Sequence, residues 1–273
     1  MGLDPLMPET VSVVIPTFNS AATIERALKS VVGQTCPPTE VIVIDNGSTD
    51  ETVARVRTFA SRYQSMAWTI EVVPANLGPG AARNLGWNLA KSDFIAFLDS
   101  DDSWHPEKLR LQGETVGLFP ESVLFGHRYL VLRASETARR DLDERLSTFV
   151  DRFELHHFLI RNRLSTPTVM LRREITQRFP TDFWYGEDYA LWLKVVAAHG
   201  AAIVQQYALA YLHKSTYGES GLSANMTQMH RGEILAVRQL RQSGGISKLG
   251  GSLTTAWMKI KYVRRRMELA LRV

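Results

Sequence analysis

Four short runs of apolar and β-branched residues constrain the fold of this chain most strongly. They occupy residues 11–16, 41–45, 68–73 and 93–98. Continuous apolar runs of this length are typical of strands that are buried on both faces of a sheet. Segments with apolar residues at helical spacing separate them. The alternation predicts an α/β fold with a mostly parallel central sheet flanked by helices.

The carboxyl ends of these strands are expected to lie together. Right-handed crossover connections place the ends of parallel strands at one edge of the sheet. Pro16, Asp45 and Asp99 stand at such ends. Because ligands of open α/β sheets bind in the crevice at that edge, these residues predict one site although they are far apart in sequence.

Helix starts can be proposed from local signals. Ser20 is expected to cap a helix over residues 21–32, and Ser48 with Glu51 forms a capping-box pattern. Gly78-Pro79-Gly80 opens another helix, whose free N–H groups would suit an anion, and Arg83 follows one turn later. The alternative is that Arg83 is an ordinary surface residue.

The second half of the chain is less regular. Residues 122–132 are expected to form a strand, residues 133–163 are charge-rich and expected to be helical, and residues 186–199 are expected to form a helix. The segment 169–174 begins as a strand and then leaves the sheet. No internal repeat or low-complexity segment is present.

The stretch DFIAFLDSDDSW ends an apolar run in three carboxylates within four residues. On an extended backbone Asp99 and Asp101 point to the same side, where each would raise the pKa of the other unless a cation joins them. Hard oxygen ligands favour magnesium or manganese. The alternative is structural, because Asp101, Asp102 or Ser103 could cap a helix starting near Pro106.

Other polar and aromatic residues follow the strands. Asp45 could accept a hydrogen bond from a nucleobase N–H, and Phe18 could stack on the ring. Each has a structural alternative, since Phe18 could belong to the core and residues such as Asn19, Ser48 and Asp50 could serve turns.

The motifs together resemble family 2 glycosyltransferases with the GT-A fold. The matching segments are VSVVIPTFN, VIVIDNGSTD, NLGPGAARNLG, FIAFLDSDD and GEDYALWLKV, within residues 11–224. The resemblance implies a Rossmann-like sheet, a nucleotide-sugar donor and a divalent metal. It assigns Pro16, Phe18 and Asp45 to the nucleobase, usually uracil. Asn46 departs from the second Asp of many members, which leaves the base identity open.

The resemblance also distributes the remaining donor and metal roles. It places Arg83 near the base or diphosphate, and Asp99 or Ser100 near the ribose. Asp101 is the more direct metal ligand, with Asp99 in the same motif. His213 is assigned to the metal or the diphosphate, although a histidine satisfied at a strand end is the alternative.

The segment WYGEDYALW carries the expected catalytic base. The resemblance assigns that role to Asp188, with Glu187 as the second choice, and implies inversion at the anomeric carbon. Acids at a helix N-terminus are also stabilising without any function. The span Ser165–Met170 is expected to line the acceptor site by analogy with the family.

The resemblance implies an inverting transferase that moves a hexose or N-acetylhexosamine unit from a UDP-sugar, in polysaccharide or cell-envelope glycan synthesis. Two other functions are alternatives to it. A sugar-phosphate nucleotidyltransferase would need a Gly-rich, Arg-containing loop after the first strand, where this chain has PTFNSAAT. A non-catalytic nucleotide-binding relative would have substituted metal or base positions, but Asp99, Asp101 and Asp188 are all present. The expected acceptor is a saccharide or lipid-linked saccharide.

Length and charge complete the expectations. The 273 residues divide into a glycosyltransferase domain over 1–225, with a nucleotide-binding half to about 105, and a C-terminal helical extension over 226–273. The lone Cys36, no recognisable secretion signal and no long apolar run favour a cytoplasmic protein.

The positive charge is concentrated at one end of the chain. Residues 256–273 contain six basic residues and one acidic residue, so the rest of the chain is near −1. A localised excess argues against a nucleic-acid partner. The basic amphipathic tail has two interpretations, which are packing on the core and peripheral contact with the inner membrane surface.

Overall fold

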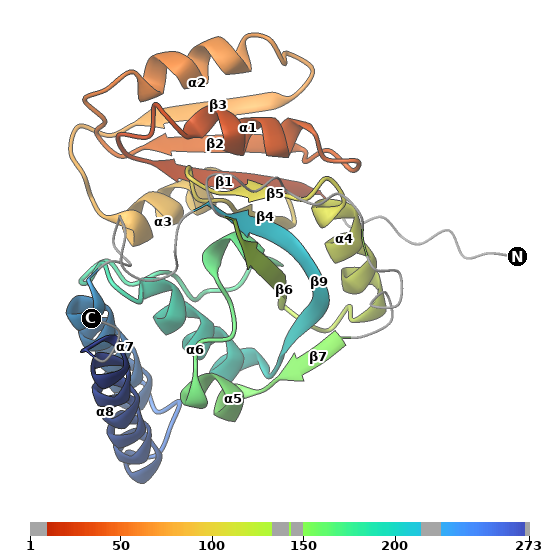
Figure 1. Ribbon diagram of the computed structural model, residues 1–273. Helices are drawn as coiled ribbons and strands as arrows, with labels where there is room; N and C mark the ends of the chain where they lie inside the picture. The colour runs from red at the N-terminus through yellow and green to blue at the C-terminus, as the bar shows by residue number, and fades with distance from the viewer. Residues whose placement is uncertain (1–9, 133–141, 143–149, 214–224, 271–273) are drawn as a thin grey trace, which may run out of the picture.

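The computed structural model describes residues 10–132, 142, 150–213 and 225–270. Within them, nine strands join in one sheet (Figure 1). In chain order these are β1 (Val11–Thr17), β2 (Glu40–Asp45), β3 (Ala67–Val72), β4 (Phe94–Phe97), β5 (Ser103–Trp104), β6 (Leu124–Val131), β7 (Val150–Phe153), β8 (Met170–Arg172) and β9 (Ala202–Leu212).

The sheet is parallel in one half and mixed in the other. Its order is β3-β2-β1-β4-β8-β6-β9-β5, with β7 paired to β9. The first four strands are parallel, as the apolar runs predict. Strand β8 then inserts antiparallel to both β4 and β6. The predicted Rossmann-like sheet is therefore confirmed for the first half, and the second half adds antiparallel strands.

Helices cover both faces of the sheet. They are α1 (Ile24–Val32), α2 (Thr52–Ala60), α3 (Pro79–Leu89), α4 (Lys108–Leu118), α5 (Leu155–Ile160), α6 (Glu187–His199), α7 (Met226–Gln242) and α8 (Lys248–Ala270). Apolar residues of α1, α2 and α4 form one core with Val13 and Ile15. Those of α3, α6 and α7 form the other with Val14. Alternate residues of one strand thus serve opposite cores.

Several local predictions were wrong. The predicted helix over 133–163 is confirmed at α5 and wrong at β7, and the residues 133–141 and 143–149 lie outside the described part of the chain. Ser20 does not cap α1 with its side chain, because its hydroxyl contacts the Ser100 hydroxyl at 2.8 Å. Ser48 does not form a capping box, because its hydroxyl and N–H both donate to Asp45.

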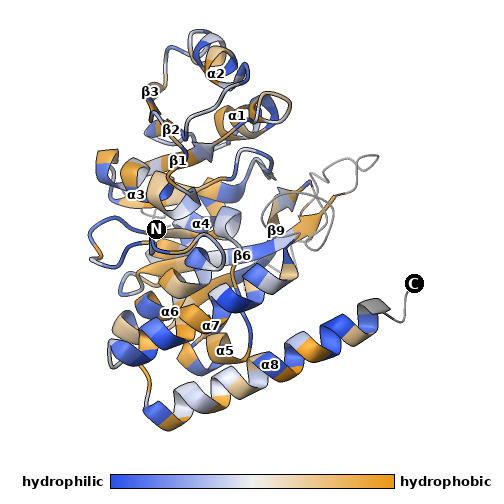
Figure 2. Ribbon diagram, turned by 90° about the vertical axis from the view of Figure 1, so that its left-hand side faces the viewer, coloured by the Kyte–Doolittle hydropathy of each residue, from blue (hydrophilic) through white to orange (hydrophobic). Residues whose placement is uncertain are grey.

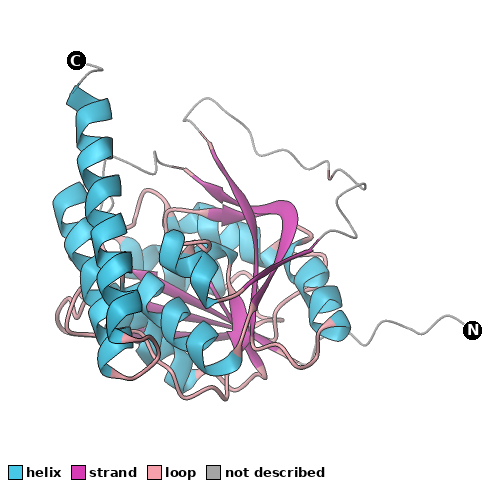
Figure 3. Cartoon of the chain, turned by 90° about the horizontal axis from the view of Figure 1, so that it is seen from below, coloured by secondary structure: helices cyan, strands magenta, loops and turns pink. Residues whose placement is uncertain are grey.

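The C-terminal extension is two helices that stand side by side (Figure 3). Helix α7 packs on α6, and its Ala236, Val237 and Leu240 belong to the same core as α3 and α6. A Cβ atom on Gly232 would lie 1.7 Å from the carbonyl oxygen of Tyr185. The extension is therefore closely joined to the loop that precedes α6, as only a glycine permits.

In the described part of the chain, no helix combines the length and the apolar composition that crossing a bilayer requires.

Candidate functional site

A cavity of about 790 Å³ opens at the carboxyl ends of β1 and β4. Eight of the predicted site residues line it, namely Pro16, Phe18, Arg83, Asp99, Ser100, Asp101, Glu187 and Asp188. The strand-end argument thus brings together residues that are up to 172 positions apart in sequence. Asp45 and His213 do not belong to the lining.

The acidic stretch after β4 is a turn rather than an extended strand. The N–H of Asp102 donates to the carbonyl of Asp99 at 3.0 Å, so the prediction of an extended backbone there was wrong. Asp99 and Asp101 nevertheless both line the cavity. The capping alternative is also wrong, because α4 starts at Lys108 with no side-chain cap hydrogen bond.

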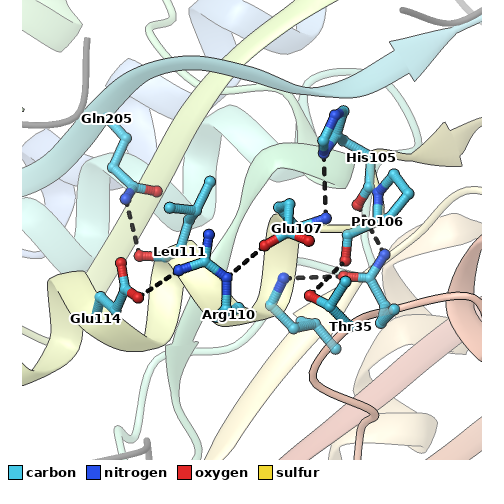
Figure 4. A network of polar contacts seen from close by, with 10 residues as sticks. Thr35, His105, Pro106, Glu107, Arg110, Leu111, Glu114 and Gln205 are labelled. Carbon is cyan, nitrogen blue, oxygen red and sulfur yellow. Dashed lines mark hydrogen bonds and ion pairs between the residues drawn. The ribbon is translucent and has the colours of Figure 1, made fainter. Parts of the chain in front are cut away.

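The segment that follows this turn is held firmly against the first half of the chain (Figure 4). The Gln34 amide nitrogen donates to the carbonyl of His105 at 2.8 Å, and its oxygen accepts from the N–H of Leu109 at 2.9 Å. The N–H of Thr35 donates to the carbonyl of Pro106. Because these bonds fix the start of α4, they also fix the turn just before it.

Arg83 is the centre of the site. Its guanidinium donates to Asp99 at 2.7 Å and to Glu187 at 2.8 Å, and its side chain is only 6% exposed. It is therefore not the surface residue of the structural alternative. Burial acts to lower the pKa of Arg83, and the two carboxylates overcome this effect and raise it. One buried cation thus joins the turn after β4 to the first residue of α6.

The acids at the start of α6 are unusually poor acids. Burial raises the pKa of Glu187 above its ordinary value, against the opposing effect of Arg83. Burial also raises the pKa of Asp188, against hydrogen bonds from the N–H of Tyr189 and the side chain of Asn162. A carboxylate with a raised pKa binds a proton more readily, as a general base must.

Asn46 clamps the loop that leads into α3. Its amide nitrogen donates to the side chain of Asn76 at 2.8 Å and to the carbonyl of Gly78 at 3.2 Å. Its oxygen accepts from the N–H of Leu77 at 2.9 Å. The departure from the family pattern therefore has a structural reason, because an aspartate could not donate to these two oxygens.

Asp45 serves the turn after β2 in this structure. It is 1% exposed, and Ser48 donates to it from both the N–H and the hydroxyl. Its predicted contact with a nucleobase is not tested by this geometry and stays a prediction.

The N-terminus of α3 is covered rather than open. A Cβ atom on Gly80 would lie 2.6 Å from the carbonyl of Pro180, so the two backbones are in close contact. The Asn84 side chain also exchanges two hydrogen bonds with the backbone of Phe179. Helix α3 therefore joins the two halves of the domain, while Pro79 in its first turn lines the cavity. The predicted anion site at this helix end stays a prediction.

His213 lies beside the acidic turn. Its Nε2 contacts the Ser103 hydroxyl at 2.7 Å, and its N–H donates to Asp102 at 3.3 Å. Burial and the charge of Arg26 lower its pKa, which favours the neutral imidazole. In this structure the ring nitrogen is used by Ser103, as the alternative of a histidine satisfied at a strand end expects. The role of His213 as a metal ligand stays a prediction.

Several residues that line the cavity were not predicted as site residues from the sequence. Asn76 and Trp184 come from loops, and Met229 comes from α7 of the extension. Ser165 and Thr166 also line the cavity, as expected for the span Ser165–Met170. Topology alone does not place α7 against the site, so Met229 could not have been found from strand ends.

A divalent cation fits the oxygen ligands of the turn only when substrate completes the site. In the described ranges, no three His, Cys, Asp or Glu side chains are grouped closely enough to hold an ion. Asp99 and Asp101 offer two carboxylates on the cavity wall. Hard oxygen ligands of this kind suit magnesium or manganese, which retain several ligands from water or substrate phosphates.

Comparison with protein families matches residues 12–178 to Glycosyl transferase family 2. A curated relative is the UDP-Glc:alpha-D-GlcNAc-diphosphoundecaprenol beta-1,3-glucosyltransferase WfgD of Escherichia coli. It is 30% identical over 188 residues, which cover 68% of this chain and 69% of the relative. Glycosyltransferase AglE of Haloferax volcanii is also 30% identical, over 74% of this chain and 64% of its own length.

Solved structures share the fold. The S. aureus TarS 1-349 complex with UDP-GlcNAc has a TM-score of 0.70 at 21% identity, covering 91% of this chain and 71% of TarS. The Pyrobaculum calidifontis mannosyltransferase PcManGT, with GDP-Man and Mn2+, has a TM-score of 0.66 at 18% identity, covering 94% of this chain and 75% of its own. These likenesses confirm the predicted GT-A fold.

Replacement of Arg83 by Met should destabilise the protein by about 3–5 kcal/mol, because it leaves the buried Glu187 and the partly buried Asp99 without their cation. Urea unfolding measures this loss of stability. The loss should become smaller as the pH falls, since burial raises the pKa of Glu187, and an unpaired Glu187 would take up a proton in the folded state and gain stability at lower pH.

Arg55→Met is the matched control. Arg55 pairs with Glu51 at 3.0 Å but is 43% exposed, so its loss should cost about 1 kcal/mol or less. Equal losses of unfolding free energy in the two variants would show that the buried bridge stabilises the protein no more than an exposed ion pair does.

Proposed function

Since the chain belongs to glycosyl transferase family 2, we propose that it transfers a sugar from a nucleotide-sugar, with UDP as the nucleotide, to an acceptor hydroxyl. The acceptor is a saccharide or a lipid-linked saccharide of a cell-envelope glycan. This proposal is supported by WfgD, whose name gives UDP-Glc as donor and a diphosphoundecaprenol-linked GlcNAc as acceptor. TarS bound to UDP-GlcNAc adds support for the nucleotide.

The observation that carries this proposal is the presence of two kinds of carboxylate in one cavity. Asp99 and Asp101 lie on the donor side, and Asp188 lies at the start of α6. A non-catalytic relative would have no need to keep a partly buried acid with a raised pKa in the same cavity as an acidic turn. The arrangement therefore favours catalysis over nucleotide binding alone.

We assign the chemistry to residues of this cavity. Phe18, 44% exposed beside Pro16, stacks on the nucleobase. Asp99 and Asp101 would hold manganese or magnesium, and the ion would supply positive charge to stabilise the leaving nucleoside diphosphate. Asp188 removes the proton of the acceptor hydroxyl, with attack opposite the leaving group, so that the configuration inverts.

A thermal-shift titration with UDP, dTDP, GDP and CMP, each with and without manganese, tests the donor site. UDP with manganese should raise the melting temperature most, because the ion offsets repulsion between the diphosphate and the acidic turn. Asp101→Ala should remove the dependence on manganese. If no nucleotide stabilises the protein, the donor assignment fails.

Asp188→Asn should lower transfer by about 10²- to 10⁴-fold and leave UDP binding unchanged, because it removes a base without moving the donor site. The base acts when ionised, so wild-type kcat/KM should fall as the pH is lowered through the raised pKa of Asp188. Rates by release of UDP measure both effects. Full activity of Asp188→Asn would show that Asp188 is not the general base, and the role would then be assigned to Glu187.

Helix α8 supports a further part of the proposal, which is contact with a membrane surface. Six exposed apolar or small residues recur along one side at spacings of three and four, namely Leu249, Leu253, Ala256, Ile260, Val263 and Met267. The buried Met258 and Thr254 are on the opposite side, which faces the protein. Figure 2 shows hydrophobic and hydrophilic segments alternating along this helix.

The charges beside this apolar stripe match an anionic lipid surface. Lys259, Arg264 and Arg266 are exposed at its flanks. Each basic residue near such a surface contributes about 1 kcal/mol of attraction. The sequence left two interpretations of the tail, which were packing on the core and contact with a membrane. The structure supports packing for one face of α8 and lipid contact for the other. We propose that the protein acts at the cytoplasmic face of the membrane.

Flotation with vesicles tests this contact. The wild type should float with anionic phosphatidylglycerol vesicles and much less with neutral phosphatidylcholine vesicles. Ile260→Asp with Val263→Asp should abolish flotation, because the pair places two charges in the stripe. Leu118→Asp, a change at an equally exposed residue of α4, should have no effect. Flotation of the double variant at the wild-type level contradicts the assignment.

A further inference from the structure

Trp184 is an exposed tryptophan on the wall of the cavity. Trp87, Trp104 and Trp192 are almost fully buried, whereas Trp184 is 40% exposed and Trp257 of α8 is 44% exposed. Of these, Trp184 is the one that lines the cavity. Leaving a large aromatic side chain in water costs free energy that burial would recover. An exposed indole on the wall of a cavity therefore indicates a surface that a ligand covers.

The ring lies with one face against the backbone of Gly78. A Cβ atom built on Gly78 would be 2.4 Å from Nε1 of Trp184 and 2.7 Å from both Cδ1 and Cε2. An approach along the ring plane would place the two carbons clearly farther away than the nitrogen. The near-equal distances thus mean that Gly78 lies against one face of the indole, so a ligand that stacks on the ring would have to use the opposite face.

The support beneath the ring is rigid. Gly78 has a φ of 86°, which favours glycine, and its carbonyl and N–H are held by the side chains of Asn46 and Asn76. Asn46 is 3% exposed, with its amide used by the loop. The indole therefore rests on a fixed surface and does not need to be ordered when a ligand arrives.

The position of the ring points to the acceptor. Trp184 stands two residues before Gly186 in the segment that leads into Glu187 and Asp188, and all of them line the cavity. If Asp188 takes the acceptor proton, the acceptor sugar must lie beside this segment. The proposed nucleobase site already has an exposed aromatic residue in Phe18, which follows β1 and also lines the cavity.

We propose that the free face of Trp184 is the stacking platform for the pyranose ring of the acceptor. Sugar rings have an apolar C–H face that packs on aromatic rings, while their hydroxyls remain available to polar groups. Stacking here holds the ring so that one hydroxyl meets Asp188. This assignment rests on the proposed transferase function and adds a residue that selects the acceptor.

The test separates acceptor from donor. Trp184→Ala and Trp184→Leu should each raise the KM for a short-chain lipid diphosphate carrying GlcNAc by about tenfold, the size expected for loss of an aromatic stack. Trp184→Phe should restore most of the affinity, because it keeps an aromatic face. The KM for the donor, UDP binding and the slow hydrolysis of the donor by water should not change.

Two further variants make the result specific. Gly78→Ala should reproduce the acceptor defect, because its Cβ displaces the indole. Trp68→Phe, on β3 and outside the cavity, is the matched control and should keep the wild-type acceptor KM.

Two kinds of outcome overturn the assignment in different ways. An unchanged acceptor KM in Trp184→Ala, or a raised donor KM in its place, would show that Trp184 does not hold the acceptor. Absence of both transfer and donor hydrolysis in the wild type would overturn the proposed function, and this assignment with it.

Discussion

The buried bridge from Asp99 through Arg83 to Glu187 is the interaction on which the site depends. Each of the three side chains comes from a different element, namely the turn after β4, helix α3 and helix α6. A buried cation with two carboxylates is stable only as a set, because loss of one member leaves an uncompensated charge. The position of the proposed base relative to the acidic turn is therefore fixed by electrostatics as well as by packing.

Helix α3 has a wider part in this arrangement. It packs on β1 and β2, its first turn contacts Pro180, and its Asn84 bonds to Phe179. The proposed donor side and the proposed acceptor side of the cavity thus share one element. Helix α3 belongs to the first half of the chain and contacts the second half directly.

The sequence predicted which strand-end residues would meet, because buried strands fix where their polar ends lie. The topological rule for parallel strands was enough to bring Pro16, Phe18, Asp99 and Asp101 to one cavity, and their donor and metal roles stay predictions. Prediction failed where side chains had competing local partners. Ser48 bonds to Asp45 instead of capping α2, and the acidic stretch closes into a turn. The strand predicted at the start of the segment 169–174 is confirmed as β8, but its antiparallel direction was not predicted, since a three-residue strand carries little pattern.

The contact between Gly232 and Tyr185 limits how this chain can diverge. The family match ends at residue 178, before the proposed base and the two C-terminal helices. Yet α7 touches the loop before α6 so closely that any side chain at residue 232 would collide with a carbonyl. A C-terminal helix pair taken from a relative can therefore be grafted here only if it brings a glycine at this point, so a substitution in one part of the contact is constrained by the other.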